Sequence, residues 1–366
     1  MSTLKVDGIR SNSATSDAIT LANDGTCSAN ITSINGGPVG TKNFVINGAM
    51  TVAQRGADST GSGYKTVDRW SSNYSVQDAP YQMQVAVASG TTPYSLGFRK
   101  AFQVMNGNQS NGATAGSILY IRQIIESQNI AQSGWNYTSS SSFITLSFWI
   151  KSSVAQSFHG HLRSRDGTSQ RYPFQTGALT ANTWTKITKV IPGNSNIQFD
   201  TDTTANRIDR GLDVVICPYM GTTYSSSSTT FDQWQATTND NFAGTDMTTT
   251  WFTTNDATLD ITGVQLEVGS TASSFAFESY ADTLRKCQRY FSKRDNAIYG
   301  GRYDSSSKGS VLIFHPVEMR TTPTYTYSNI RTTSGLDTSA SYPDRFQGFM
   351  SHDKPFFTDL KFEAEL

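Results

Sequence analysis

The stretch FITLSFWIK, residues 143–151, alternates between two kinds of side chain. Every second residue is strongly apolar, and these residues are Ile144, Leu146, Phe148 and Ile150. The positions between them are mixed, namely Phe143, Thr145, Ser147 and Trp149. Because successive side chains of a β-strand point to opposite faces of its sheet, this pattern predicts a strand with one face in an apolar core. The stretch therefore indicates a protein built from packed sheets.

Similar strand signals recur on both sides of this stretch, between residue 43 and residue 279. They include the runs NFVING, YQMQVAVAS, RKAFQVMNG, SILYIRQII, TWTKITKVIPG, DVVICPYMG and ATLDITGVQLEVG. The connections are rich in Ser, Thr, Asn and Gly, and helical periodicity is scarce. Many strands separated by turn signals are typical of an antiparallel sandwich or jelly roll. The predicted fold class is therefore all-β, with a jelly-roll sandwich at 43–279.

Two smaller segments flank the predicted sandwich. Residues 1–42 place a few apolar residues between Asn, Asp and Gly turns, which predicts small strands that cannot form a core of their own. At the other side, SYADTLRKCQRYF (279–291) repeats apolar residues at helical steps behind Ser279, an N-cap candidate. Five strand candidates follow. We therefore expect 280–366 to hold a linking helix and a small C-terminal β domain.

Charge and composition argue against several classes of function. Lys plus Arg equals Asp plus Glu at 29 each, so no net charge attracts nucleic acid or an anionic bilayer. The sequence has neither a run of about 18 apolar residues nor a leader-like layout, so neither membrane insertion nor signal-directed secretion is expected. Cys27, Cys217 and Cys287 are far apart without a C-x-x-C motif, and all three are expected to be reduced.

Three motifs, taken in order, resemble those of bacteriophage tail-fibre and related virion proteins with a carbohydrate-binding-module-like jelly roll. They are NFVINGAMTVAQRG, YKTVDRW and WFTTNDATLDITGVQLEVGSTASSFAFESYADTLRKCQRYF, which together span 43–291. DAITLANDGT in the first segment resembles a fibre attachment or shaft segment, and the chain after CQRYF resembles a small C-terminal fibre domain. The resemblance implies a homotrimeric virion component that displays host-binding domains.

This resemblance also implies a location and partners. The expected role is a non-enzymatic tail fibre or adhesin on a virion surface, assembled in the host cytoplasm. Residues 1–42 would contact other virion proteins and would gain a core where three copies wrap together. The remaining domains would bind a host-surface glycan or receptor. A virion decoration or connector protein without a receptor and a host-glycan depolymerase are the alternatives, and the sequence selects neither tail nor head.

The motif YKTVDRW raises the question of whether its charge pair acts on a ligand or holds the fold. We expect Trp70 to be buried in the sandwich, because a large aromatic side chain contributes most when it is buried. Asp68 and Arg69 are then expected to tie loops together. A ligand-contacting role is the alternative.

Sugar binding needs flat aromatic faces beside hydroxyl and amide groups. Two stretches rich in Ser, Thr and Asn supply both, and the candidate glycan or receptor contacts in them are Trp135, Tyr137, Tyr224 and Trp234. Packing in the core is the alternative for each of them. The next candidates lie in the C-terminal domain and are Tyr303, Tyr325 and Tyr327.

Catalytic glycan cleavage needs two carboxylates roughly 5 to 10 Å apart. The candidate acids are Glu126, Glu267, Glu278 and Glu318. None of them has a second acid at a spacing that indicates a catalytic pair, so all four are expected to be structural. His159 and His161 share a strand face and could hold a metal, but no third ligand is recognisable. The favoured interpretation of this pair is a solvent-facing strand beside Arg163 and Arg165.

A metal site stays unassigned at this point. Asp200, Asp202 and Asp209 offer oxygen ligands, but they lack the spacing and the glycine of an EF-hand loop. No cofactor is expected. A structural calcium is left open because the resemblance to carbohydrate-binding-like jelly rolls suggests one.

Overall fold

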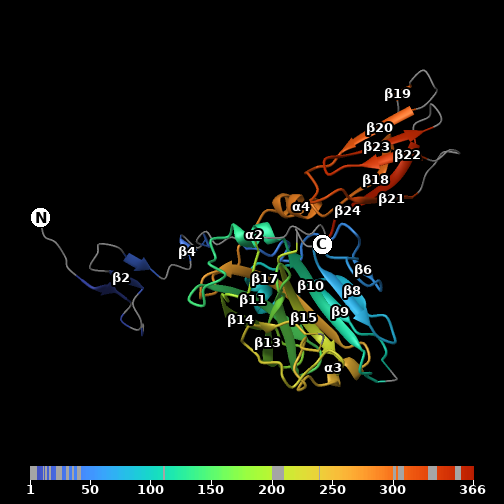
Figure 1. Cartoon of the computed structure of the whole chain (residues 1–366). Helices are drawn as coiled ribbons and strands as arrows, with labels where there is room; N and C mark the ends of the chain where they lie inside the picture. Colours follow the sequence, from blue (N-terminus) through green and yellow to red (C-terminus); the bar gives the residue numbers. More distant parts are fainter. Residues whose placement is uncertain are drawn as a thin grey trace, which may run out of the picture.

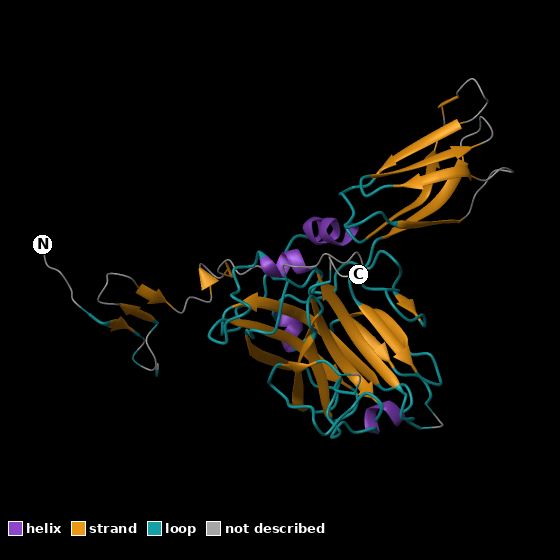
Figure 2. Ribbon diagram, in the orientation of Figure 1, coloured by secondary structure: helices purple, strands orange, loops and turns teal. Residues whose placement is uncertain are grey.

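The structure is a computed structural model that describes most of the chain. The described residues are 6–10, 12, 15, 18–21, 27–29, 33–34, 37–38, 43–109, 112–199, 210–238, 240–299, 302–303, 309–328, 336–350 and 356–366. Strands dominate these residues (Figure 1, Figure 2), and neighbouring strands pair antiparallel throughout the sheets. The all-β prediction is confirmed.

The central body is a sandwich of two six-stranded sheets. The first sheet has the order β16-β13-β12-β15-β10-β7, with the bounds β7 Ser71–Ser75, β10 Ile118–Ile125, β12 Ser157–Ser164, β13 Gln170–Ala178, β15 Leu212–Met220 and β16 Gln235–Ala236. The second sheet has the order β14-β11-β17-β9-β8-β6, with the bounds β6 Asp58–Ser59, β8 Tyr81–Ala86, β9 Lys100–Met105, β11 Phe143–Ser152, β14 Thr185–Pro192 and β17 Thr258–Val268.

Eight of these strands give the sandwich its jelly-roll topology. Along β9 to β15 and then β17, the chain crosses between the sheets at each step except at the β12–β13 hairpin, and the short strand β16 is added at the edge of the first sheet. The order β9-β17-β11-β14 therefore lies in one sheet and β10-β15-β12-β13 in the other, which is the strand order of a jelly roll. The predicted fold is confirmed at this level of detail.

Strand β11 supplies the core in the way that its alternation predicts. Ile144, Leu146, Phe148 and Ile150 are all fully buried between the two sheets. Thr145 on the opposite face is buried as well, and its hydroxyl donates to the Gly269 carbonyl oxygen at 2.7 Å. The chain that follows β17 therefore covers the outer face of β11.

The stretch NFVING, predicted as a strand, is instead a series of turns. Asn43 Oδ1 accepts a hydrogen bond from the Val45 amide at 3.0 Å, and Asn47 lies in the left-handed region with φ of 57°. The Asn47 amide group also donates to the Val52 carbonyl oxygen at 2.9 Å. These side-chain bonds to the backbone replace the ladder of a strand, which is why asparagine favours turns.

Four helices lie among the described residues, namely α1 Thr92–Ser95, α2 Ser127–Ala131, α3 Thr250–Thr253 and α4 Tyr280–Gln288. The helix α4 begins at the predicted cap, where the Ser279 hydroxyl oxygen accepts from the Asp282 amide at 3.2 Å. It ends at Gln288, three residues earlier than predicted, because β18 begins at Phe291. In the described part of the chain, no helix has the length and apolar character needed to cross a membrane.

The first segment forms small strands without a core. A three-stranded sheet contains β1 Gly8–Ile9, β2 Ile19–Leu21 and β3 Cys27–Ala29, and β4 Ser33–Ile34 pairs with β5 Gly37–Pro38. In Figure 1 the strand β2 lies apart from the sandwich. Every residue of 6–21 whose burial is described is at least partly exposed, and Ile9 and Leu21 are 52% and 40% exposed.

The C-terminal segment forms two further sheets beyond α4 (Figure 1). One has the order β18-β24-β21 and the other β19-β20-β23-β22, with the bounds β18 Phe291–Tyr299, β19 Arg302–Tyr303, β20 Gly309–Phe314, β21 Thr324–Ser328, β22 Leu336–Ser341, β23 Arg345–Met350 and β24 Phe356–Glu363. Its core includes Phe346, Leu360 and Phe362. The domain limits 1–42, 43–279 and 280–366 stay predictions.

The motif YKTVDRW lies where the sandwich meets the end of the chain. Trp70 is fully buried, as predicted, and its indole N–H donates to the Asn47 carbonyl oxygen at 3.2 Å. Arg69 pairs with Glu365, and its guanidinium carbon lies 3.4 Å from the centre of the Tyr290 ring. The charged residue before the tryptophan therefore joins the sandwich to the C-terminal segment.

Candidate functional site

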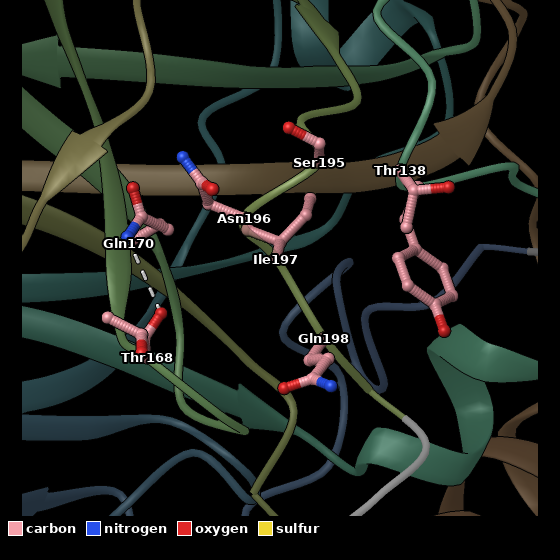
Figure 3. Close-up of a pocket in the computed structure, with 8 residues that line it drawn as sticks. Thr138, Thr168, Gln170, Ser195, Asn196, Ile197 and Gln198 are labelled. Atoms are coloured by element: carbon pink, nitrogen blue, oxygen red, sulfur yellow. Dashed lines mark hydrogen bonds between the residues drawn. The ribbon is translucent and has the colours of Figure 1, made fainter.

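An open cleft of about 660 Å³ lies at the end of the sandwich where β14 ends and β13 begins. Three segments line it: residues 137–138 before β11, Thr168 and Gln170 at the β12–β13 hairpin, and residues 195–198 after β14. In Figure 3 the 195–198 segment runs between Thr168 and Gln170 on one side and Thr138 on the other. The cleft therefore combines parts of the chain that are far apart in sequence.

Local hydrogen bonds hold the segment after β14 against the loop before β11. The Asn194 amide donates to the Tyr137 carbonyl oxygen at 2.7 Å, and Asn194 Oδ1 accepts from the Asn196 amide at 2.8 Å. Gly193 permits this close approach, because a Cβ atom there would lie 2.5 Å from the carbonyl oxygens of Tyr137 and Ser139. The backbone shape, and with it the wall of the cleft, depends on this glycine.

The lining of the cleft is polar and uncharged. Six of its eight side chains carry a hydroxyl or an amide, and these are Thr138, Thr168, Gln170, Ser195, Asn196 and Gln198. The other two are Ile197 and Tyr137. Hydroxyl and amide groups can donate and accept hydrogen bonds, and an aromatic ring offers an apolar face. The lining therefore suits a neutral ligand that carries many hydroxyl groups.

Trp135 and Tyr137 are close together, but only one of them lines the cleft. Tyr137 is half-buried, and its ring lies edge-on 5.1 Å from that of Phe199. Trp135 is only 3% exposed, and its indole N–H donates to the Ser142 carbonyl oxygen at 3.2 Å. Core packing, the alternative considered for Trp135, is what the structure shows, because its loop folds back and inserts the indole into the end of the core.

Neither Tyr224 nor Trp234 lines this cleft. Tyr224 is half-buried, with its ring edge-on 5.9 Å from Phe242. The Trp234 indole N–H donates to the Pro192 carbonyl oxygen at 2.7 Å, and its ring packs edge-on against Tyr172 at 5.4 Å. Both side chains have structural partners, and a glycan contact for either of them stays a prediction.

The tyrosines of the C-terminal domain differ in exposure. Tyr325 is half-buried and packs on Phe346 with 4.9 Å between ring centres, whereas Tyr327 is 44% exposed. The side chain of Tyr303 lies outside the residues whose burial the structure describes. A receptor contact for these residues also stays a prediction.

The two histidines of FHGHL are buried, at 1% and 2% exposure, so the expectation of a solvent-facing strand is wrong. The loop after β15 covers them: the Gly244 amide donates to His159 Nδ1 at 3.2 Å, and the Phe242 ring lies 5.8 Å from that of His161. Burial lowers the pKa of both imidazoles, and Arg171 beside His161 lowers its pKa further. A neutral imidazole is a good metal ligand, but among the described residues no three His, Cys, Asp or Glu side chains cluster to hold an ion.

The acidic loop considered for calcium lies outside the described residues, because 200–209 is not described. Cys217 and Cys287 are unpaired and buried, as expected. Burial raises the pKa of the Cys217 thiol to about 12, so it is protonated at neutral pH. The side chain of Cys27 is likewise outside the description.

Three of the four candidate acids have structural partners. Glu126 is fully buried and accepts from Arg289 Nε at 3.0 Å and from the Tyr290 hydroxyl. Glu267 is fully buried and accepts from the Ser273 hydroxyl at 2.6 Å. Glu278 pairs with Lys286, and Glu318 is exposed in the C-terminal domain.

A second cleft, of about 570 Å³, lies on the outer face of the second sheet. Aromatic side chains dominate it: Trp149 of β11, Phe98, Phe275 and Phe277, of which Phe277 is 51% exposed. Lys186 is its charged lining residue. We call this second site the aromatic cleft and the first site, lined by 137–138, Thr168, Gln170 and 195–198, the polar cleft. The aromatic cleft is the alternative site for a glycan.

Sequence reasoning found Tyr137 and missed the polar residues opposite it. Thr168 and Gln170 lie in the hairpin SRDGTSQ, whose Asp-Gly pair signals a turn but says nothing of what the turn contacts. Ser195, Asn196 and Gln198 lie in a run of polar residues that resembles many other loops of this chain. The pairing of β14 with β11 brings 195–198 beside 137–138, and a bridge between Asp166 and Gln198 brings the β12–β13 hairpin beside them.

The sequence matches no protein-family model and no curated protein sequence. Solved structures with similar folds include the enzymatically active domain of tailspike protein 4 of bacteriophage CBA120, at 11% identity and a TM-score of 0.33 over 62% of this chain and 21% of that chain. They also include the N-terminal cellulose-binding domain of Cellulomonas fimi β-1,4-glucanase C, at 9% identity and a TM-score of 0.29. This match covers 61% of this chain and 99% of that chain. A third is the family 11 carbohydrate-binding module from Clostridium thermocellum, at 11% sequence identity and a TM-score of 0.26. This match covers 59% of this chain and 98% of that chain.

Proposed function

We propose that this protein is a structural fibre subunit of a phage virion that binds a neutral host-surface glycan at the polar cleft. The observation that carries the binding function is the lining of the cleft, in which one aromatic ring and six hydroxyl or amide side chains lie together without a charged group. Neutral sugars offer the matching chemistry, because each carries several hydroxyl groups and an apolar C–H face.

The virion role is supported by two features of the chain. The order of the motifs over 43–291 resembles that of phage fibre proteins. The coreless sheet of β1, β2 and β3 exposes Ile9 and Leu21, which a homotrimer would bury. Through this segment the trimer would also attach to other virion proteins.

A non-catalytic role is part of the proposal. Glu126 and Glu267 are buried and hydrogen-bonded to neighbouring groups of the fold, so neither is placed to protonate a glycosidic bond in solvent. The depolymerase alternative is tested by measuring reducing ends released from host polysaccharide. Release by the purified wild-type protein would establish an enzyme instead.

The binding site is tested with purified variants on an array of neutral bacterial polysaccharides. Tyr137→Ala and Asn196→Ala should each weaken binding, and the loss of the ring in Tyr137→Ala should weaken it about tenfold, the effect of losing about 1.4 kcal/mol. Tyr280→Ala is the matched control, because Tyr280 is 60% exposed on α4. Its binding should equal that of the wild type.

The aromatic cleft provides the opposing result. Glycan binding could be unchanged in Tyr137→Ala and Asn196→Ala but lost in Phe277→Ala. That result would assign the glycan site to the aromatic cleft. Wild-type protein that binds no glycan and no host cell would leave a decoration or connector role as the better account.

A further inference from the structure

A short segment of the loop after β15 covers the outer face of β12. It comprises residues 241–246, and we call it the cover segment. Ala243 and Gly244 in this segment are buried, and the Phe242 ring lies edge-on 5.8 Å from the ring of His161. The cover segment therefore lies directly on the strand face that carries both buried histidines.

The bond from Gly244 determines where His159 carries its proton. The Gly244 amide lies 3.2 Å from His159 Nδ1, and a backbone N–H can only donate, so Nδ1 is unprotonated. The hydrogen of the neutral ring is then on Nε2, which lies 3.5 Å from Asp246 Oδ1. The Gln175 nitrogen also lies near Nε2, at 3.3 Å, but it has the Asp246 carboxylate as its acceptor. Two residues of the cover segment thus contact opposite sides of one neutral imidazole.

His161 has the partners of a neutral ring as well. Its Nδ1 lies 4.0 Å from Cys217 Sγ of β15. Burial keeps the Cys217 thiol protonated by raising its pKa to about 12, and a thiol is a weak donor. The backbone of Phe242 provides a further hydrogen bond to the ring. The second histidine is therefore also joined to the cover segment.

The surroundings of both rings oppose a positive charge. Burial is the main cause that lowers the pKa of each imidazole, and at His159 the Asp246 carboxylate, which is 59% exposed, offsets part of this shift. At His161 three nearby arginines lower the pKa further. Besides Cys217, the titratable groups beside His161 are those of Arg171, Arg163, Arg165, Tyr120, Arg122 and Asp213.

We propose that the cover segment is a pH-sensitive lid, which is closed over β12 while both histidines are neutral and opens when they take up protons. Protonation of His159 places a hydrogen on Nδ1 that faces the Gly244 N–H, so their hydrogen bond is lost. Protonation of both rings also places two positive charges on one buried strand face. Opening gives the rings access to water. This proposal is independent of glycan binding at the polar cleft.

Acid favours the open lid, because exposed histidines bind protons that the covered histidines do not. An exposed histidine has a pKa of about 6.5, and the covered rings have lower values. The stability of the closed lid is therefore fully present above about pH 6.5 and is lost as the pH falls below it. A covered histidine that stays neutral should raise the ratio of open to closed lids about tenfold between about pH 7.5 and about pH 5.5.

Hydrogen exchange of the backbone amides measures this opening in the full chain. Rates at the two pH values are divided by the intrinsic rate of an unprotected amide at the same pH. The protection of the Gly244 amide should fall about tenfold or more at the lower pH. The Asn194 amide is the internal control, because its bond to the Tyr137 carbonyl oxygen joins two loops of the polar cleft instead. Equal protection of Gly244 at both pH values would overturn the proposal.

Variants separate the histidines from other titrating groups. The double variant with His159→Asn and His161→Asn offers uncharged acceptors in place of Nδ1 and binds no proton in this pH range. Its Gly244 protection should be the same at both pH values. His315→Asn is the matched control, because burial lowers the pKa of this histidine too, but its ring packs on Phe362 in the C-terminal segment. The control should keep the wild-type response. A response of wild-type size in the folded double variant would contradict the proposal.

A direct titration covers the case in which the double variant does not fold. Nitrogen NMR of wild-type protein labelled at the imidazole nitrogens reports the tautomer and the pKa of each histidine. The variants His315→Asn and His352→Asn assign the other two signals. His159 and His161 should both carry their hydrogen on Nε2 and stay neutral at about pH 6. A hydrogen on Nδ1 of either neutral ring, or a pKa of about 6.5 or higher, would refute the lid.

Discussion

Trp70 and Arg69 are neighbours in the chain but have different partners. Trp70 points into the sandwich core, whereas Arg69 pairs with Glu365 near the end of the chain. Arg69 has a left-handed backbone, with φ of 71°, which is uncommon for a residue with a side chain. This backbone turn lets one short motif fill the core of the sandwich and hold Glu365, which follows the last strand β24.

At the residue scale we predict a large loss of stability for Trp70→Ala. The fully buried indole fills the core and donates to Asn47, so its removal should cost about 3 to 5 kcal/mol of the free energy of unfolding. Denaturant unfolding followed by circular dichroism measures this loss. Leu96→Ala is the control, because Leu96 is 52% exposed, and it should shift stability by no more than about 0.5 kcal/mol. Equal midpoints for Trp70→Ala and wild type would contradict the burial of the indole.

At the scale of elements, β12 shows that alternation predicts faces but not exposure. His159, His161 and Arg163 lie on one face, as the two-residue step predicts. That face is covered, however, by the loop that carries Phe242 and Gly244, so the histidines are buried. The cover is long-range in sequence, and β12 itself carries no sign of it.

The helix α4 gives the element-scale prediction. Its Ser279 hydroxyl caps the first turn by accepting from the Asp282 amide, so Ser279→Ala should cost about 1 kcal/mol. Ser279→Asn is the matched control, because asparagine caps as well as serine and should restore most of this loss. Two measurements report the effect: the unfolding midpoint of the C-terminal region and the hydrogen-exchange rates of the backbone amides in α4 and β18. Indistinguishable exchange rates in the alanine variant would show that the cap contributes nothing.

At the scale of the whole molecule, the described chain contains two bodies with cores and, before them, the small sheet of β1, β2 and β3 and the pair of β4 with β5. The sandwich and the C-terminal sheets each bury their own apolar residues. The sheet of β1, β2 and β3 buries none of the residues whose exposure is described. Because a small sheet that buries no apolar residue gains little stability by itself, we expect packing against another chain to stabilise this segment.

We predict a trimer that depends on this first segment. Light scattering of the full chain should give about three times the 40.0 kDa mass of one chain, whereas a protein lacking residues 1–42 should give one chain mass with its sandwich folded. Circular dichroism and the unfolding midpoint of the truncated protein confirm that the sandwich is intact. A full chain that stays at one chain mass at micromolar concentration would refute the trimer.

Local pattern predicted the sandwich and the helix behind Ser279, and together with the resemblance to fibre proteins it predicted the burial of Trp70. These features depend on side-chain periodicity, on a capping residue and on the size of an aromatic side chain, all of which are readable within a few neighbouring residues. The turns at NFVING were misjudged because the bonds from Asn43 and Asn47 to the backbone outweigh an apolar pattern that suits a strand.

Tertiary structure alone decided which side chains face solvent and which meet in a site. It buried Trp135 and both histidines, and it placed Tyr137 in the lining of the same cleft as Gln170 and Gln198. The reason is that jelly-roll crossings pair strands that are distant in sequence, so the contents of each cleft depend on strand register and on covering loops. Sequence determined the elements and their faces, and the long-range packing of those faces determined the candidate sites.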